Sequence, residues 1–467
     1  MTTLDMSQQM RKNLDYVIKG IQDSNDKSTV ANITMLFKSK RWTKLKVYLS
    51  REIKWFHVHQ DFVRNYTDKM TAELEIGIDE YKVLYSIRKD LWCDVEITYL
   101  RPDHTVDLDE VPCGQRKADF TLKCKAMLIQ YEDIFKKIPA ERLWPKDRDQ
   151  VDQDRPTLKM TVELIEEKMY YARKEVINAV FRDTYMHQVL KYVCNYLGFD
   201  KAHIEKPHNT KQYTNFVIPP SKGIDTIIPW LQTAPGFGIY TTGCCFYVAR
   251  NIVYIWPRYG EPTCKYPRHV YCIANNVSLE SLNRTDCRDK DCAKTYHMLV
   301  AGGLNEKNHS DVGTENAPDA FNVFMDQNAI DGTRRLKADG VWEANQMVRD
   351  LVVLPSDPID MNDFIKVQFR HSHDNEFALY SELQSYQGST VEFDWAKARP
   401  WSFIPSTVVN IHYDDPTGYK TIKGMTESAD YMYRKAKNAN LEPLFICSAK
   451  IRVEVKNILG GERNNFK

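Results

Sequence analysis

Hydrophobic and polar side chains alternate along much of the chain, which is the pattern of β-strands that bury one face. The alternation is clearest at residues 70–78 and 95–99. It returns in five further segments: 118–128, 157–167, 365–369, 405–420 and 445–455. A strand with one apolar face needs a partner sheet or a closed barrel to bury that face. The chain is therefore predicted to be rich in β-structure toward both ends.

Helical spacing marks the N-terminus. The apolar residues that share one side of a helical wheel there are Met6, Met10, Leu14, Val17, Ile18 and Ile21. Asn25, Asp26 and Ser28 end the pattern. The segment is an amphipathic arm. The arm packs either on its own domain or on a neighbouring subunit.

Two further helices are predicted in the middle of the chain. In the first, Asp183 or Thr184 caps the first turn and Gly198 ends the helix. Its buried stripe consists of Met186, Val189, Leu190, Val193, Tyr196 and Leu197. The second helix covers 221–235, and its regularity is limited by Gly223 and Pro229.

An aromatic hairpin follows directly. Residues 239–248 and 252–256 have the alternation of paired strands, with a polar turn at 249–251 and Pro257 at the end. The hairpin contains no recognisable catalytic residue. Its purpose is interpreted as architectural: the core of a unit that holds two β-rich halves at a fixed angle.

The predicted fold class is β-rich α+β, with two β-barrels joined by a smaller α+β connecting unit. The predicted boundaries are a helical arm at 1–29, a first barrel at 30–155, a connecting domain at 156–295, and a second barrel with a C-terminal tail at 296–467. Residues 146–156 are a charged surface connection. Asp147, Asp149, Asp152 and Asp154 lie in this stretch, but it lacks the internal glycine and closing glutamate of a calcium loop. Residues 300–345 are predicted to be long loops.

Composition is that of a globular protein. The 467 residues are 43% apolar and 27% charged, and the net charge is +1, so no strong field attracts nucleic acid or a membrane surface. No stretch approaches the roughly 18 consecutive apolar residues of a membrane-spanning helix. The N-terminus lacks the apolar core of a signal peptide, so folding in the cytosol is expected.

The eleven cysteines are an odd number without framework spacing, which favours reduced, buried thiols. Four of them cluster near His269 and His297: Cys264, Cys272, Cys287 and Cys292. Their gaps are not those of a zinc site. Reduced thiols, a disulfide and a zinc ion all stay open for this cluster.

No known catalytic motif is present: there is no nucleophile elbow, phosphate loop, zinc-protease helix or dinucleotide fingerprint. Two histidine pairs could chelate a metal, His57 with His59, and His371 with His373 beside Asp374, but two ligands do not make a site. Glu166 and Glu167 point to different sides of an extended chain and form no acid/base pair. His187 has no metal-spaced partner. We therefore predict no catalytic, cofactor-binding or metal-binding residue, and no cofactor.

The order of these features, over residues 50–455, resembles the baseplate hub protein of contractile phage tails, a family related to the hub portion of type VI secretion spikes. TDKMTAELEIGIDEYKVLYSIRKDLW resembles the first-barrel hairpin of that family, and LIEEKMYYARKEVINAVFRDTYMHQVLKYV resembles the strand, loop and helix that leave that barrel. The segment from His208 to Tyr259 resembles the helix and aromatic hairpin of such hubs. IPSTVVNIHY and TIKGMTESADYMY resemble closing strands of the second barrel, where a glycine is expected at the position of Ser406.

The resemblance implies a structural virion protein of the tail baseplate, assembled in the host cytoplasm, and no enzyme. Three copies would adapt the hexameric tail tube to the trimeric central spike. The implied partners are the tail tube protein, the central spike protein, baseplate wedge proteins and, in passing, DNA and the tape-measure protein, without stable membrane insertion. The alternatives are a tail-associated cell-wall hydrolase and a receptor-binding or capsid-decorating β protein.

Overall fold

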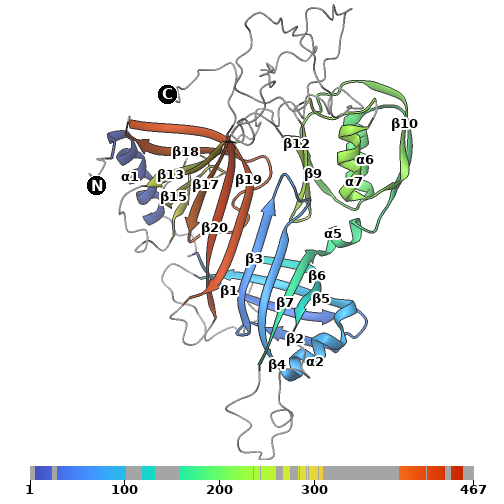
Figure 1. The fold of residues 1–467 in the computed structure, drawn as a ribbon, viewed down its shortest axis with the longest axis horizontal. Coiled ribbons are helices and arrows are strands. Elements are labelled where there is room, and N and C mark those ends of the chain that lie inside the picture. Colours follow the sequence, from blue (N-terminus) through green and yellow to red (C-terminus); the bar gives the residue numbers. More distant parts are fainter. Residues whose placement is uncertain are drawn as a thin grey trace, which may run out of the picture.

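The computed structural model describes residues 6–23, 29–100, 118–131, 157–308 and 389–455, with gaps at 235, 242, 259–266, 274–281, 283, 291, 293, 303, 417 and 437–442. The fold is β-rich, as the sequence predicts, and it is built around one large sheet (Figure 1). The predicted strand at 365–369 and the connection at 146–156 lie outside the described residues. Among the described helices, none is both long enough and apolar enough to span a bilayer.

Eight strands of this sheet are joined in a closed circuit of backbone pairing. In spatial order the circuit runs β1, β5, β6, β7, β4, β3, β19 and β20, and β20 pairs with β1 again. The bounds are β1 (Val30–Ser39), β3 (Ile53–Asp61), β4 (Lys69–Gly77), β5 (Leu91–Tyr99), β6 (Phe120–Tyr131), β7 (Thr157–Glu166), β19 (Gly418–Lys435) and β20 (Leu444–Val455). The short strand β2 (Lys46–Leu49) also pairs with β1, and α2 (Ile78–Ser86) and the 3-10 helix η1 (Arg88–Asp90) connect β4 to β5. We call these eight strands the first circuit.

A second group of strands continues from the other ends of β19 and β20. On the β19 side, β18, β13, β15 and β14 follow in order, and on the β20 side β17 and β16 follow. Their bounds are β13 (Arg268–Ile273), β14 (Asp286–Arg288), β15 (Tyr296–Ala301), β16 (Asn305–Asn308), β17 (Ser389–Ala396) and β18 (Val408–Asp415). The β14 side of this group contacts β17 through side-chain hydrogen bonds, because the Thr285 hydroxyl donates to the Ala396 carbonyl over 2.8 Å and accepts from the Trp395 indole over 2.9 Å. We call these strands, with β19 and β20, the second circuit.

Strand β19 belongs to both circuits. Its first part pairs with β18 and its last part pairs with β3, while β20 runs beside it from Gly424 to Lys435. The register shifts between Thr426 and Ser428, where the strand passes from one circuit to the other. One continuous hydrophobic core includes side chains of both circuits, from Ile33 and Phe56 to Trp395 and Ile451.

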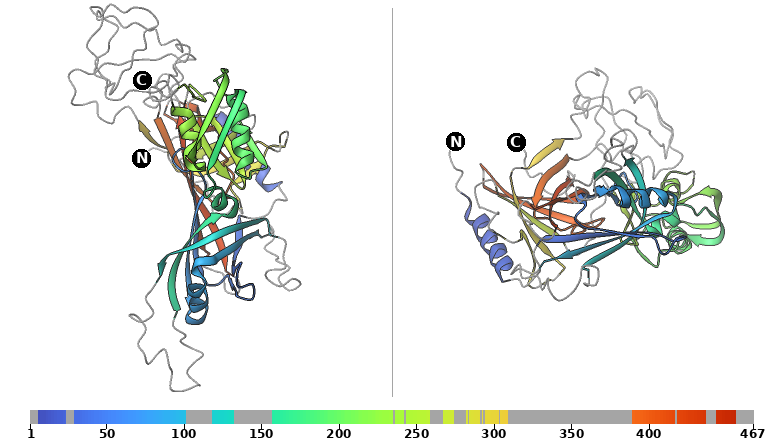
Figure 2. Two further views of the ribbon diagram at one scale, coloured as in Figure 1. Left: turned by 90° about the vertical axis from the view of Figure 1, so that its right-hand side faces the viewer. Right: turned by 90° about the horizontal axis from the view of Figure 1, so that it is seen from below.

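A smaller α+β unit lies between β7 and β13 in the sequence, and it forms the part of the molecule opposite α1 (Figures 1 and 2). We call it the middle unit. It contains a two-stranded sheet of β8 and β10 and a three-stranded sheet of β11, β12 and β9. Its elements are α5 (Glu167–Ala172), β8 (Ile177–Tyr185), α6 (Met186–Tyr196), β9 (Lys201–Ile204), β10 (Gln212–Lys222), α7 (Ile224–Thr233), β11 (Cys244–Ala249) and β12 (Ile252–Pro257). They enclose a separate apolar core.

Helix α1 (Gln8–Gln22) packs on its own chain, against β13, β14 and β15 of the second circuit. Met10, Leu14, Val17 and Ile21 form its buried face. The Ser7 hydroxyl caps the helix and also donates to Asp414 over 2.7 Å. The helix therefore packs within the chain, on the second circuit.

Two details of the predicted helix near residue 190 are wrong. Neither Asp183 nor Thr184 is the N-cap, because β8 continues to Tyr185 and pairs Thr184 with Tyr213 of β10. The Gln188 side chain instead accepts the Tyr185 N–H over 3.0 Å. Tyr196 is 45% exposed and is not part of the buried stripe. The predicted hairpin and the second helix are confirmed, although the first hairpin strand begins at Cys244 and not at residue 239, and the helix is shorter, Ile224–Thr233.

The predicted barrels and domain boundaries stay predictions, but the pairing crosses these boundaries. Strand β7 lies in the predicted connecting domain and pairs with β4 and β6 of the first circuit. Strand β13 lies in the same predicted domain and pairs with β18. Ser406, where a glycine was expected, has a φ of 60°, a conformation that glycine adopts at least cost.

Gly424 lies close to the point where β19 passes from one circuit to the other. A substitution there tests how closely the β20 backbone approaches β19. A Cβ added there would lie 2.6 Å from the Glu454 carbonyl oxygen and 2.5 Å from Val453. Because the backbone contact cannot yield easily, Gly424→Ala should lower the free energy of unfolding by about 2 kcal/mol. Chemical denaturation measures this change. The exposed neighbour Lys423→Ala is the control, and equal stability of the two variants would contradict the close approach.

Candidate functional site

The tip of the aromatic hairpin is held by a buried carboxylate of the first circuit. Arg250 and Asn251 form a tight turn between β11 and β12, with φ values of 50° and 63°. Both backbone N–H groups of this turn donate to Glu166, the last residue of β7, over 3.1 Å each. One side chain therefore accepts hydrogen bonds from both N–H groups of the turn, which point away from the β11–β12 pairing.

A second buried carboxylate, Asp68, joins three parts of the chain. It accepts hydrogen bonds from Gln60 of β3 over 2.8 Å, from the Tyr247 hydroxyl of β11 over 2.7 Å, and from the Trp401 indole N–H over 2.6 Å. Gln60 belongs to the first circuit, Tyr247 to the middle unit, and Trp401 to the connection between β17 and β18. Charge-assisted hydrogen bonds of this kind are stronger than neutral ones.

Apolar side chains surround this network. They come from the segment after β3, from the hairpin strands β11 and β12, and from β19, and form one cluster: Phe62, Cys245, Tyr247, Ala249, Tyr254, Trp256 and Met425. The Phe62 and Tyr247 rings meet edge to face at 4.9 Å. The Val248 N–H also donates to the Tyr66 carbonyl over 2.8 Å. We call the two carboxylates, their donors and this cluster the junction.

The two carboxylates of the junction have perturbed acidities. Burial, and then the charge of Asp68, raise the pKa of Glu166 to about 7, against the lowering effect of the two turn N–H groups and Arg250. Burial raises the pKa of Asp68 as well, although its three hydrogen-bond donors and Arg250 act in the opposite direction. Whether Glu166 and Asp68 carry a proton therefore depends on the positions of the hairpin and of Trp401.

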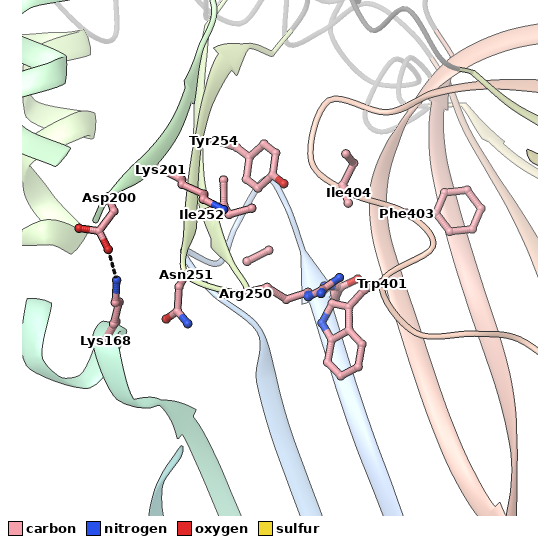
Figure 3. A pocket seen from close by; sticks show the side chains of 12 residues that line it. Lys168, Asp200, Lys201, Arg250, Asn251, Ile252, Tyr254, Trp401, Phe403 and Ile404 are labelled. Atoms are coloured by element: carbon pink, nitrogen blue, oxygen red, sulfur yellow. Dashed lines mark hydrogen bonds and ion pairs between the residues drawn. The ribbon is translucent and has the colours of Figure 1, made fainter. Parts of the chain in front are cut away.

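A pocket of about 370 Å³ opens beside the junction, between the hairpin and the connection before β18 (Figure 3). Arg250 points across it toward Trp401, and Lys168 of α5 pairs with Asp200 at 2.8 Å on the opposite wall. The lining combines cationic side chains with apolar ones such as Ile404. The arrangement can fix three segments of the chain relative to one another.

Two histidines that the sequence analysis considered as metal ligands, without predicting a site, come together with a third residue that the sequence did not indicate. His57 and His59 of β3 both contact Asp430 of β19. Among the described residues, these three form the group that could hold a metal ion. Residues His371, His373 and Asp374 lie outside the described part of the chain. His187 is exposed and stacks on Tyr185.

Glu166 and Glu167 diverge as predicted. Glu166 faces the hairpin turn. Glu167, the first residue of α5, instead pairs with Lys40, which directly follows β1. No acid/base pair is formed by these two carboxyls.

The cysteine cluster near β13 is divided among different environments. Cys272 and Cys287 are buried, reduced thiols, and Cys292 is a half-buried, reduced thiol, while Cys264 lies outside the described residues. Cys287 contacts the Val17 carbonyl of α1 through its thiol, at 3.7 Å. The described cysteines of the cluster therefore act as small buried groups or surface thiols.

The two histidines of that cluster belong to a row of stacked rings beneath α1. His269 stacks between His297, at 5.1 Å, and His412, at 5.2 Å. The ring of Tyr16 on α1 meets His297 edge to face. Burial, and then a neighbouring histidine, lower the pKa of His269 and of His412 to about 4 each, so both are neutral at pH 7.

Three residues of these sites were not indicated by the sequence: Asp68, Trp401 and Asp430. Each acts through a partner far away in the chain, and the contact between Trp401 and Asp68 spans 333 residues. A single aspartate or tryptophan without a local motif carries no signal of such a partner. The alternation of β11 and β12 did reveal the hairpin that the junction holds.

Comparison with known proteins finds a partial match to one phage family. Residues 137–271, less than a third of the chain, match the family model of the bacteriophage PBS1 gene 109 protein. No curated protein matches the chain. The solved structures that are similar to the chain include phage tail proteins. The resemblance stated from the sequence is confirmed to this extent.

Several solved structures are similar to the chain. The 43 kDa tail protein of prophage MuSo2 from Shewanella oneidensis shares 10% identity, with 90% of this chain and 98% of that chain covered and a TM-score of 0.43. A tail protein from Neisseria meningitidis MC58 shares 10% identity, with 91% and 96% covered and a TM-score of 0.42. The Escherichia coli c3393 protein, a type VI secretion component similar to T4 tail proteins gp27 and gp5, shares 9% identity, with 86% and 73% covered and a TM-score of 0.35.

The raised pKa of Glu166 predicts a defined pH dependence. The folded chain holds this proton up to about pH 7, whereas the ordinary pKa of the unfolded carboxyl is 4.5. Glu166 therefore contributes fully to the free energy of unfolding below pH 4.5. This contribution, about 3 kcal/mol at most, is lost as the pH rises from 4.5 to about 7. Glu166→Gln should remove this contribution, so the stability difference between wild type and variant should shrink from pH 5 to pH 7.5.

Urea denaturation at several pH values measures that difference. Taking the difference cancels the titration of the histidines beneath α1, which are common to both proteins. Glu163→Gln, on the same strand but outside the junction, is the matched control. A wild-type-minus-variant difference that stays constant or grows with pH would contradict the proton on Glu166.

Proposed function

We propose that this chain is the hub of a contractile phage tail baseplate, in which three copies join the hexameric tail tube to the trimeric central spike. The observation that carries the proposal is the presence of two strand circuits in one chain, which share β19 and β20. We interpret each circuit as a barrel. Three copies then offer six strand-built rings to a hexameric tube and one threefold surface to the spike.

The shared strands and the junction support this role because both restrict relative movement. A protein that adapts one symmetry to another must present its two rings at a constant angle. Strand β19 carries backbone pairing in both circuits, and Asp68 joins the first circuit, the middle unit and Trp401. The role needs no catalytic group.

Exposed apolar side chains on the middle unit supply a surface for subunit contacts. Val180 of β8 and Val217 of β10 lie opposite each other in the two-stranded sheet and are 66% and 51% exposed. Contiguous exposed apolar surface on a folded protein marks an interaction site. We assign this face to contacts between copies. The tube, spike and wedge proteins, and the passing DNA and tape-measure protein, are the further partners of the proposed hub.

The mass of the purified full-length chain tests the proposal. Sedimentation equilibrium should give three times the mass of one chain, and the protein should leave peptidoglycan intact. A monomer that degrades peptidoglycan would instead favour a cell-wall hydrolase. A stable monomer without that activity would also contradict the trimeric hub.

The assigned contact face has its own test. Val180→Asp places a charge on an exposed position, so the chain should still fold, but the trimer should dissociate at a concentration at least tenfold higher than that of the wild type. Tyr48→Asp, an equally drastic change at an exposed aromatic on β2, is the control. If Val180→Asp and Tyr48→Asp both leave the trimer unchanged, this face is not the subunit contact.

A further inference from the structure

We propose that His57, His59 and Asp430 form a binding site for a divalent transition-metal ion on the outer face of the first circuit. This site is independent of the hub role. Its chemistry follows from where two neighbouring strands place three donor side chains.

Backbone pairing brings the three residues to one face of the sheet. In the β3–β19 register, His59 lies directly opposite Asp430, and His57 lies opposite Met432. Because side chains alternate along a strand, His57 and His59 share a face, and Asp430 shares it with its cross-strand partner. The opposite face of the same strands carries buried core residues such as Phe56 and Tyr431.

The donor atoms converge on one point. The Asp430 Oδ1 atom lies 3.1 Å from His59 Nδ1 and is also in contact with His57 Nε2. One ligand atom from each residue lies within 4.8 Å of the other two. Two imidazole nitrogens that face one carboxylate oxygen can turn their lone pairs toward an ion placed between them.

A further side chain supports the imidazole of His57. Thr71 of β4 lies opposite His57, and its hydroxyl is 3.5 Å from His57 Nδ1. With Nε2 bound to an ion, Nδ1 carries the proton and faces a hydroxyl that can accept it as a hydrogen bond. Such outer contacts orient ligand histidines and fix their tautomer.

The donor set decides the class of ion. Imidazole suits Zn²⁺, Cu²⁺, Ni²⁺ and Fe²⁺, whereas Mg²⁺ and Ca²⁺ prefer oxygen ligands alone. Two histidines and one carboxylate leave positions open for water or another ligand. The side chains of His57, His59 and Asp430 are 25%, 36% and 42% exposed, so an ion can enter from solvent.

The surrounding charges permit a cation. With neutral imidazoles the three ligands carry a single negative charge, on Asp430. Lys450 lies opposite Asp430 on β20, but it is ion-paired with Glu392 at 2.6 Å. Lys69 lies opposite His59 on β4 and is the cationic neighbour that opposes binding.

A bound ion would join segments that are distant in the chain. His57 and Asp430 are 373 residues apart in the sequence. They lie on β3 and β19, whose backbone pairing is one of those that close the first circuit. An ion that binds the folded chain and not the unfolded one stabilises the fold by mass action. The ion would therefore raise the melting temperature in proportion to the logarithm of its concentration.

Titration of the metal-free full-length chain with Co²⁺ tests the site, with visible absorption as the readout. We expect one equivalent to bind with the d–d bands of nitrogen and oxygen ligands, and Zn²⁺ to displace it. His57→Asn and His59→Asn should each weaken binding at least tenfold, and Zn²⁺ should no longer raise the melting temperature of the double variant. A thiolate-to-cobalt charge-transfer band would overturn the proposal, because it would place the ion on cysteine.

The matched control is a double variant of two exposed histidines on the middle unit, His187→Asn with His203→Asn. It removes the same number of imidazoles and should bind Co²⁺ as the wild type does. Equal melting temperatures of all variants without metal would show that each one folds. Equal Co²⁺ affinity of the wild type and the His57/His59 double variant, or no binding to the wild type at all, would contradict the site.

Discussion

The fold depends on the backbone pairing of β19 with β20. These two strands are the only ladder that belongs to both circuits among the described residues, and each circuit is completed through them. A backbone ladder resists bending and sliding because a shift by one residue would move every buried side chain to the other face. The angle between the circuits is therefore fixed by hydrogen bonds within a sheet, without dependence on a linker.

The junction adds a second constraint at the side of the sheet. Burying two carboxylates is costly unless their charges are compensated and their lone pairs are occupied. Asp68 has three donors and Glu166 has two, and Arg250 lies near both. The donors come from segments that must all be in place, so the polar network specifies one arrangement of the hairpin on the first circuit.

The sequence was most informative where structure is local. Alternation located β4, β5, β6, β7 and β20, and the turn chemistry of Arg250 and Asn251 located the hairpin, because both patterns repeat within a few residues. Long-range pairing left no such signal: nothing in residues 418–435 shows that one strand serves two circuits. The cap of α6 was misplaced because β10 holds Thr184 in a strand, a tertiary effect that outweighs its capping preference. Asp68, Trp401 and Asp430 gain their roles from partners hundreds of residues away.

The central claim is that β19 and β20 make the two circuits one cooperative body. Hydrogen exchange of the native chain in low denaturant tests it most directly, with peptides from β4 reporting on the first circuit and peptides from β18 on the second. Both sets of amides should exchange with the same opening free energy and the same dependence on denaturant. Exchange of β18 at a clearly lower free energy, while β4 stays protected, would show two independent units and contradict the account.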